Sequence, residues 1–141
     1  METLSNLFEY DSSIPNVSSY FTKVSRNGCA AINPYYTHGN MIELPLTLPM
    51  DNAQKLMNIS LNDFWEGQVQ KAKAIIERGG LVVLSLHPQP YQSANNEALK
   101  AYELALKELA KIPNVWRSRC DKIVKWIKDG HDGNSSSVGT L

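Results

Sequence analysis

The central part of the chain carries a run of almost uninterrupted apolar residues, LVVLSL at positions 81–86. Gly79 and Gly80 precede this run, and His87 and then Pro88 follow it. A run that does not alternate with polar residues, and that is bounded by residues that break strands, is typical of a strand buried on both faces of a parallel sheet. The pattern therefore predicts a central strand over 81–86, with His87 at its carboxyl end.

Helical periodicity flanks this predicted strand on both sides. Apolar residues recur at helical spacing from Trp65 to Ile76, in a helix that Asn62 or Asp63 can cap and Gly79 ends. A second helix is expected over 97–111, with a buried side formed by Leu99, Tyr102, Leu106 and Leu109. A last helix is expected after Ser118, whose spacing to Asp121 resembles a capping box, with an apolar side formed by Ile123, Val124, Trp126 and Ile127.

Shorter extended segments are expected at 10–13, 29–32, 41–45 and 115–117. Strands that alternate with helices of about 10–15 residues indicate right-handed βαβ units, so the pattern predicts an α/β fold with a parallel sheet. Since 10–13 could be a strand end or a turn and 29–32 is short, three or four strands can be counted, which is fewer than a complete barrel or doubly wound domain needs. From Gly130 the chain is rich in Gly, Ser, Asn and Asp, and we expect a disordered tail over 130–141.

The charge balance narrows the classes of partner. The 141 residues contain 14 Lys and Arg and 14 Asp and Glu, so the formal net charge is zero. This balance provides no basic surface for nucleic acid and no attraction to a charged membrane, and no apolar run approaches the ~20 residues of a membrane helix. Cys29 and Cys120 are isolated, so we expect two buried thiols rather than a disulfide framework or a zinc site.

His87 is the strongest candidate for chemistry, because α/β proteins bind their ligands at the carboxyl ends of parallel strands. The alternative is a histidine that caps the strand and hydrogen-bonds to a loop. Glu43 and Asp51 are the acidic residues nearest to predicted strand ends, and either could orient His87 and favour its charged form. Each could equally be a surface carboxylate or a cap. With His38 in a loop and His131 in the tail, the three histidines show no metal-ligand spacing.

Four segments in register resemble the polysaccharide deacetylase family, the NodB-homology domain of carbohydrate esterases. They are Tyr10-Asp11-Ser12-Ser13, Ile42-Glu43-Leu44-Pro45, residues 79–88 and residues 116–126, so that the resemblance covers about residues 4–129. It implies the C-terminal part of a distorted seven-stranded β/α barrel with parallel strands. It also implies a hydrolase that removes N- or O-acetyl groups from carbohydrates.

The resemblance assigns roles to individual residues. His87 matches the family's last motif, a histidine at a strand end that acts as general acid and protonates the leaving amine or alcohol. Leu86 beside it would help to line a pocket for the acetyl methyl group. Glu43 and Asp51 complete the candidate substrate-binding residues. Either would orient the ring of His87 and favour its charged form.

The family's metal-binding residues have no counterpart in this sequence. The catalytic-base aspartate, the metal-binding aspartate and the paired metal histidines lie in the first half of the family's domain, before the segments that match here. The resemblance therefore implies a partial deacetylase-like domain over 1–129, with no cofactor in this chain and a divalent metal in the full-length parent.

Three kinds of function stay open for such a chain. The first is a deacetylase-like hydrolase whose partners are a carbohydrate substrate and the missing N-terminal half or a second copy of the chain. The second is a non-catalytic carbohydrate-binding or partner-binding module on the same scaffold. The third is a metal-free hydrolase that uses His87, for which the sequence shows no nucleophile–base pair.

Overall fold

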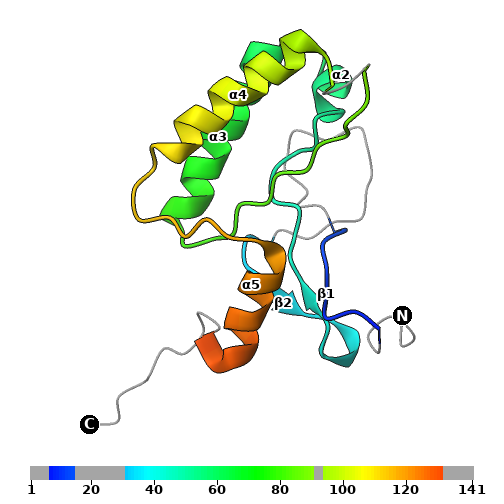
Figure 1. The fold of residues 1–141 in the computed structure, drawn as a ribbon, viewed down its shortest axis with the longest axis vertical. Coiled ribbons are helices and arrows are strands. Elements are labelled where there is room, and N and C mark those ends of the chain that lie inside the picture. Colours follow the sequence, from blue (N-terminus) through cyan, green and yellow to red (C-terminus); the bar gives the residue numbers. More distant parts are fainter. Residues whose placement is uncertain (1–6, 15–30, 91–93, 132–141) are drawn as a thin grey trace.

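The computed structural model describes residues 7–14, 31–90 and 94–131, which form a small sheet, one short helix beside it and a pair of long helices (Figure 1). The strands are β1 (Tyr10–Asp11), β2 (Tyr35–Tyr36) and β3 (Ile42–Glu43). The helices are α2 (Ala53–Met57), α3 (Leu61–Glu77), α4 (Asn96–Ala110) and α5 (Cys120–Trp126). A 3-10 turn, η2 (His38–Asn40), and a π-helical turn, η3 (Ile127–His131), complete the elements.

The sheet has the strand order β1–β3–β2 and is mixed. β1 pairs with β3 in parallel, and β2 pairs with β3 in antiparallel orientation. The turn between β2 and β3 contains Gly39 and Asn40, both in the left-handed region with φ of 68° and 62°. Glycine and asparagine tolerate this region best, so the sequence favours a tight turn here.

The prediction of a partial seven-stranded parallel barrel is wrong. Within the described residues each strand is two residues long and the sheet has three strands, one of them antiparallel. Residues 81–86, the predicted central strand, have no regular secondary structure and are half-buried rather than buried. Neither do residues 115–117 form the short strand that was expected.

Segment 81–87 nevertheless runs beside segment 47–51 in the same direction, held by isolated hydrogen bonds instead of a ladder. The backbone N–H of Val83 donates to the Thr47 hydroxyl oxygen over 2.9 Å, and that of Leu48 donates to the Val83 carbonyl over 3.3 Å. At the end of the segment, the backbone N–H of His87 donates to the Asp51 carboxylate over 2.9 Å. Side-chain oxygens thus accept where a parallel ladder would use backbone carbonyls, which explains why the predicted strand does not form.

α3 and α4 lie side by side, and segment 78–90, which follows α3, runs back beside segment 47–51, so that both helices run in the same direction (Figure 1). The N-terminal cap residue of α3 is Ser60, whose hydroxyl accepts from the backbone N–H of Asp63. Ser60 lies two residues before Asn62, the earlier of the two caps expected from the sequence. α3 is followed by Gly79, which has φ of 70° and stops the helix as predicted.

The buried side of α4 differs from the one predicted. Its buried residues are Ala98, Ala101 and Ala105, while Leu99 and Leu106 are exposed. Alanines at this position let two helix axes approach closely, and the larger groups come from α3, chiefly Phe64, Trp65 and Val69. Tyr102 and Leu109 do pack against this cluster from the edge of the stripe, as expected.

α5 covers the other side of the molecule. Its Val124 is fully buried with Ile127, against Ile42 and Leu44 from β3 and the residue that follows it. Arg119 is the N-terminal cap residue and the end has no side-chain cap, so the predicted capping box at Ser118 is wrong. Trp126, predicted on the apolar side, is exposed.

Other predictions lie wholly or partly outside the described residues. These are the thiol of Cys29 and the tail from position 132 onward. In the part of the chain that the structure describes, none of the helices combines the length and the apolar character needed to cross a membrane.

Candidate functional site

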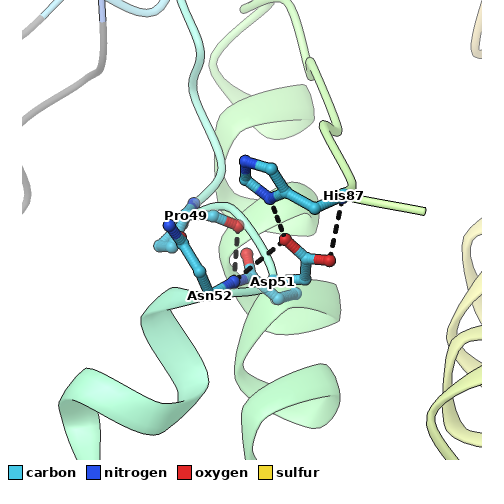
Figure 2. A network of polar contacts seen from close by, with 5 residues as sticks. Pro49, Asp51, Asn52 and His87 are labelled. Carbon is cyan, nitrogen blue, oxygen red and sulfur yellow. Dashed lines mark hydrogen bonds and ion pairs between the residues drawn. The ribbon is translucent and has the colours of Figure 1, made fainter. Parts of the chain in front are cut away.

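Asp51 and His87 meet at one end of the two parallel segments (Figure 2). The Nδ1 atom of His87 lies 2.6 Å from Oδ1 of Asp51, and the backbone N–H of His87 donates to Oδ2 over 2.9 Å. The backbone N–H of Asn52 donates to Oδ1 over 2.9 Å. One carboxylate therefore accepts from three groups and joins two segments 36 residues apart.

The two side chains differ in their exposure to solvent, 6% for Asp51 and 37% for His87. An ionised carboxylate can only accept hydrogen bonds, so Nδ1 of His87 carries the proton that lies between the two side chains. Nε2 is then the ring nitrogen available to give or take a proton. The pair thus combines a buried anion that orients the ring with an imidazole that solvent or a substrate can reach.

Local structure fixes both members of the pair. Asp51 stands at the start of α2, where the backbone N–H of Gln54 donates to its carbonyl over 3.2 Å. An aspartate is favoured here because helix N-termini present unpaired N–H groups. Leu86, next to His87, packs against the apolar cluster between α3 and α4 and so anchors the other segment. Its expected place in a pocket for an acetyl methyl group stays a prediction.

Glu43, the second acidic candidate, lies apart from this pair on β3. Its side chain is fully buried, and Oε1 accepts from the backbone N–H of Ile14 over 2.9 Å. Burial raises the pKa of Glu43, the hydrogen bond from Ile14 opposes that effect, and the nearby Asp11 carboxylate adds to it. Oε2 has no hydrogen-bond partner among the described residues. Glu43 thus fixes the chain that follows β1, and the polar contacts of the described residues do not link it to His87.

A small hollow lies behind Asp51, between the start of α2 and the first turn of α3. It is lined by Asp51, Asn52, Gln54, Lys55, Leu61, Phe64, Trp65 and Ala98. Its volume of about 20 Å³ has room for about one water molecule and none for a sugar ring.

Among the described residues, no group of three or more His, Cys, Asp or Glu side chains is arranged to hold a metal ion. His38 and His131 lie in η2 and η3, and their side chains are outside the described part of the chain. No family model, no curated protein and no solved structure matches this chain.

Proposed function

We propose that the chain carries the proton-donating part of a hydrolase that removes N- or O-acetyl groups from carbohydrates. The observation that supports it is the 2.6 Å contact between Nδ1 of a half-exposed His87 and a buried Asp51. The choice of substrate class rests on the resemblance of residues 10–13, 42–45, 79–88 and 116–126 to polysaccharide deacetylases.

In the proposed step His87 acts in its charged form. Nδ1–H donates to Asp51, whose negative charge stabilises the imidazolium. When the bond between the carbonyl carbon and the leaving group breaks, Nε2–H gives its proton to the amine nitrogen or alcohol oxygen that departs with the bonding electrons. The ring is left neutral, with Nδ1–H still held by Asp51, and solvent restores the proton.

The test is acetate release from acetylated chitin, xylan and peptidoglycan fragments. The protein is the 141-residue chain, alone and joined behind a segment that supplies the aspartate and paired histidines of the deacetylase family. We expect acetate from the joined protein and none from the chain alone, since the described residues supply only proton donation.

In the joined protein, His87→Ala should lower turnover by about 10²–10⁴-fold without changing the metal content. Glu66→Gln, a change of an exposed titratable residue on α3, is the control and should retain turnover. A joined protein that folds, binds metal and keeps full turnover after His87→Ala would contradict the proposal.

A second candidate function, carbohydrate binding without chemistry, is favoured by two exposed tryptophans. Trp116 and Trp126 are 57% and 42% exposed, and their ring centroids are 6.0 Å apart. Trp116 precedes Arg117, whose guanidinium donates to carbonyls at the end of α4 and so holds the segment. Rigid exposed aromatic rings suit the apolar faces of sugars.

Tryptophan fluorescence during titration with chitin oligosaccharides distinguishes the two functions. A binding module would show saturable binding that Trp116→Ala abolishes and His87→Ala leaves intact. Tyr36→Ala, which removes an exposed aromatic ring on β2, is the control. Saturable binding without any acetate release from the joined protein would favour the binding module over the hydrolase.

A further inference from the structure

We propose that Gln68 is a positioning residue for the Asp51–His87 pair, which it sets by holding the carbonyl of Pro49. Gln68 lies on α3 and is 4% exposed. Its Nε2 donates to the Pro49 carbonyl oxygen over 3.1 Å, two residues before Asp51. The link therefore joins a rigid helix to the segment that carries the carboxylate.

Besides the Thr47 hydroxyl, which accepts from Val83, and the Met50 carbonyl, which accepts from Ala53, the segment before Asp51 has few hydrogen bonds that could fix it. Pro45 and Pro49 have no backbone N–H to donate, and Leu48 N–H makes a long bond of 3.3 Å to Val83. α2 begins at Ala53, two residues after Asp51, so Asp51 itself lies outside the helix. The amide of Gln68 is thus the side-chain contact nearest to Asp51 on its N-terminal side, beyond the Thr47 hydroxyl that accepts from Val83.

The oxygen of the Gln68 amide bears on whether the contact with Pro49 affects stability or mainly the position of the backbone. Oε1 is buried without a hydrogen-bond partner among the described residues. A buried amide oxygen left unpaired costs free energy, so an apolar side chain of the same shape would remove one unpaired atom while creating another at Pro49. The net effect on stability should be small, whereas the position of the Pro49 carbonyl should change.

A small movement is enough to disturb the pair. Asp51 must reach both Nδ1 and the backbone N–H of His87, at 2.6 Å and 2.9 Å. Rotation of the backbone at Pro49 would displace the carboxylate from one or both, and functional groups need placement within about 0.5 Å. The inference about geometry stands alone, and its effect on turnover rests on the proposed function.

The readout is the tautomer of His87, measured by ¹⁵N–¹H correlation spectra of the imidazole rings at about pH 8.5, where an ordinary histidine is neutral. In the unmodified 141-residue chain we expect the form with a proton on Nδ1, because Asp51 accepts it. In Gln68→Met, a shape-conserving change, we expect at least a threefold rise in the Nε2–H form that free histidine favours. Asp51→Ala sets the upper limit of that rise.

Gln70→Met on the exposed side of the same helix is the matched control and should give the wild-type spectrum. Val124→Ala, a buried change on α5 in the separate cluster with Ile42 and Leu44, controls for loss of stability alone. If Gln68→Met shifts the unfolding midpoint as Val124→Ala does but keeps the wild-type tautomer, Gln68 is merely structural and the proposal is overturned.

A measurement on the unmodified chain covers the case in which Gln68→Met does not fold. One side-chain amide proton of Gln68 should exchange with solvent about tenfold more slowly than those of Gln70, because it is buried and bonded to Pro49. Equal exchange would overturn the proposal. If the tautomer shifts in Gln68→Met while His87→Ala leaves acetate release unchanged, the positioning role stands and the proposed hydrolase fails.

Discussion

Two side-chain oxygens, those of Thr47 and Asp51, hold segment 47–51 against segment 83–87. Each accepts a backbone N–H from the residue 36 positions further along the chain, Val83 for Thr47 and His87 for Asp51. The constant offset means that the two segments run in register. Since a backbone N–H buried without a partner is costly, these two side chains determine whether the pairing forms.

Thr47→Val should therefore destabilise the protein although it preserves shape. Thr47 is fully buried, and valine would leave the N–H of Val83 without an acceptor. We expect a loss of about 1–3 kcal/mol in the free energy of unfolding, measured by urea denaturation. Thr47→Ser keeps the hydroxyl and should cost less. Equal stability of the valine and wild-type proteins would show that the contact does not contribute.

At the residue scale the sequence could identify candidates but could not choose among them. Asp51 and Glu43 were both near predicted strand ends, and only the folded backbone brings Asp51 to His87. Gln68 was missed, although one signal was present. It is a polar residue on the apolar side of a helix, four positions from Phe64 and Ala72.

At the scale of the helices, Gly80 and Gly67 differ in whether packing requires a glycine at their position. Gly80 follows α3 at a close approach, where an added Cβ would lie 2.8 Å from Cγ2 of Ile75 and 3.0 Å from Cβ of Ile32. Gly67 lies inside α3, and an added Cβ would have no neighbour within 4 Å. The first glycine is required by packing, and the second weakens the helix by its backbone freedom.

We expect Gly80→Ala to lower the free energy of unfolding by about 1–3 kcal/mol, because Ile75 or Ile32 must move. Gly67→Ala should raise it by about 0.5–1 kcal/mol, since alanine favours a helix over glycine. Urea denaturation of both variants checks the pair. Similar effects of the two substitutions would mean that close packing at Gly80 does not limit stability.

Arg117 stabilises the end of α4. Its guanidinium donates to the carbonyls of Leu109, Ala110 and Ile112 over 3.0, 3.0 and 2.7 Å. Helix ends leave carbonyls unpaired, and a cation there also interacts favourably with the helix dipole.

Arg117→Ala should cost about 1–2 kcal/mol of stability and speed hydrogen exchange in the last turn of α4. Arg119→Ala is the matched control, because it removes an exposed ion pair to Asp121 and should cost less than about 0.5 kcal/mol. If the two variants are equally stable, the three carbonyl contacts add no more than an ordinary surface charge.

The positions of the two long helices could be predicted well, but not every helix face. α3 and α4 were expected close to where they lie, because their apolar periodicity extends over many residues. For α4, however, the leucines were taken as the buried side, and the helix packs through its alanines. Size and apolar character do not reveal which face must approach another helix closely.

For the whole molecule, the barrel prediction was wrong because apolar composition does not ensure that a strand finds a ladder. Residues 81–86 read as a central strand, yet their neighbours bond to them through single backbone groups and the hydroxyl of Thr47. The short sheet is instead held by the buried Glu43, whose carboxylate accepts from the backbone N–H of Ile14. Local sequence patterns do not reveal such hydrogen bonds between residues that are far apart in the chain.

Two buried ionisable groups, those of Glu43 and Lys71, make the stability of the protein depend on pH in opposite directions. Burial raises the pKa of Glu43 above 4.5, so its contribution to stability is complete below pH 4.5 and is lost as pH rises through the raised value. Burial lowers the pKa of Lys71 below 10.5, and its Nζ has no hydrogen-bond partner among the described residues. Its contribution is complete above pH 10.5 and is lost as pH falls through the lowered value.

Glu43→Gln and Lys71→Met should therefore change stability with opposite slopes. Relative to wild type, Glu43→Gln should gain free energy of unfolding as pH rises above 4.5, because wild type must ionise a buried carboxyl. Lys71→Met should gain as pH falls below 10.5, because wild type must charge a buried amine. Each pH unit between the folded and unfolded pKa is worth about 1.4 kcal/mol.

Urea denaturation from about pH 4 to about pH 11 measures both slopes in one series. Glu66→Gln and Lys100→Met, substitutions of exposed residues on α3 and α4, are the matched controls and should run parallel to wild type. If Glu43→Gln runs parallel to wild type as well, burial does not perturb that carboxyl, and the hydrogen bond from Ile14 offsets the loss of water. If Lys71→Met runs parallel, the ammonium group reaches solvent and is not held in the interior.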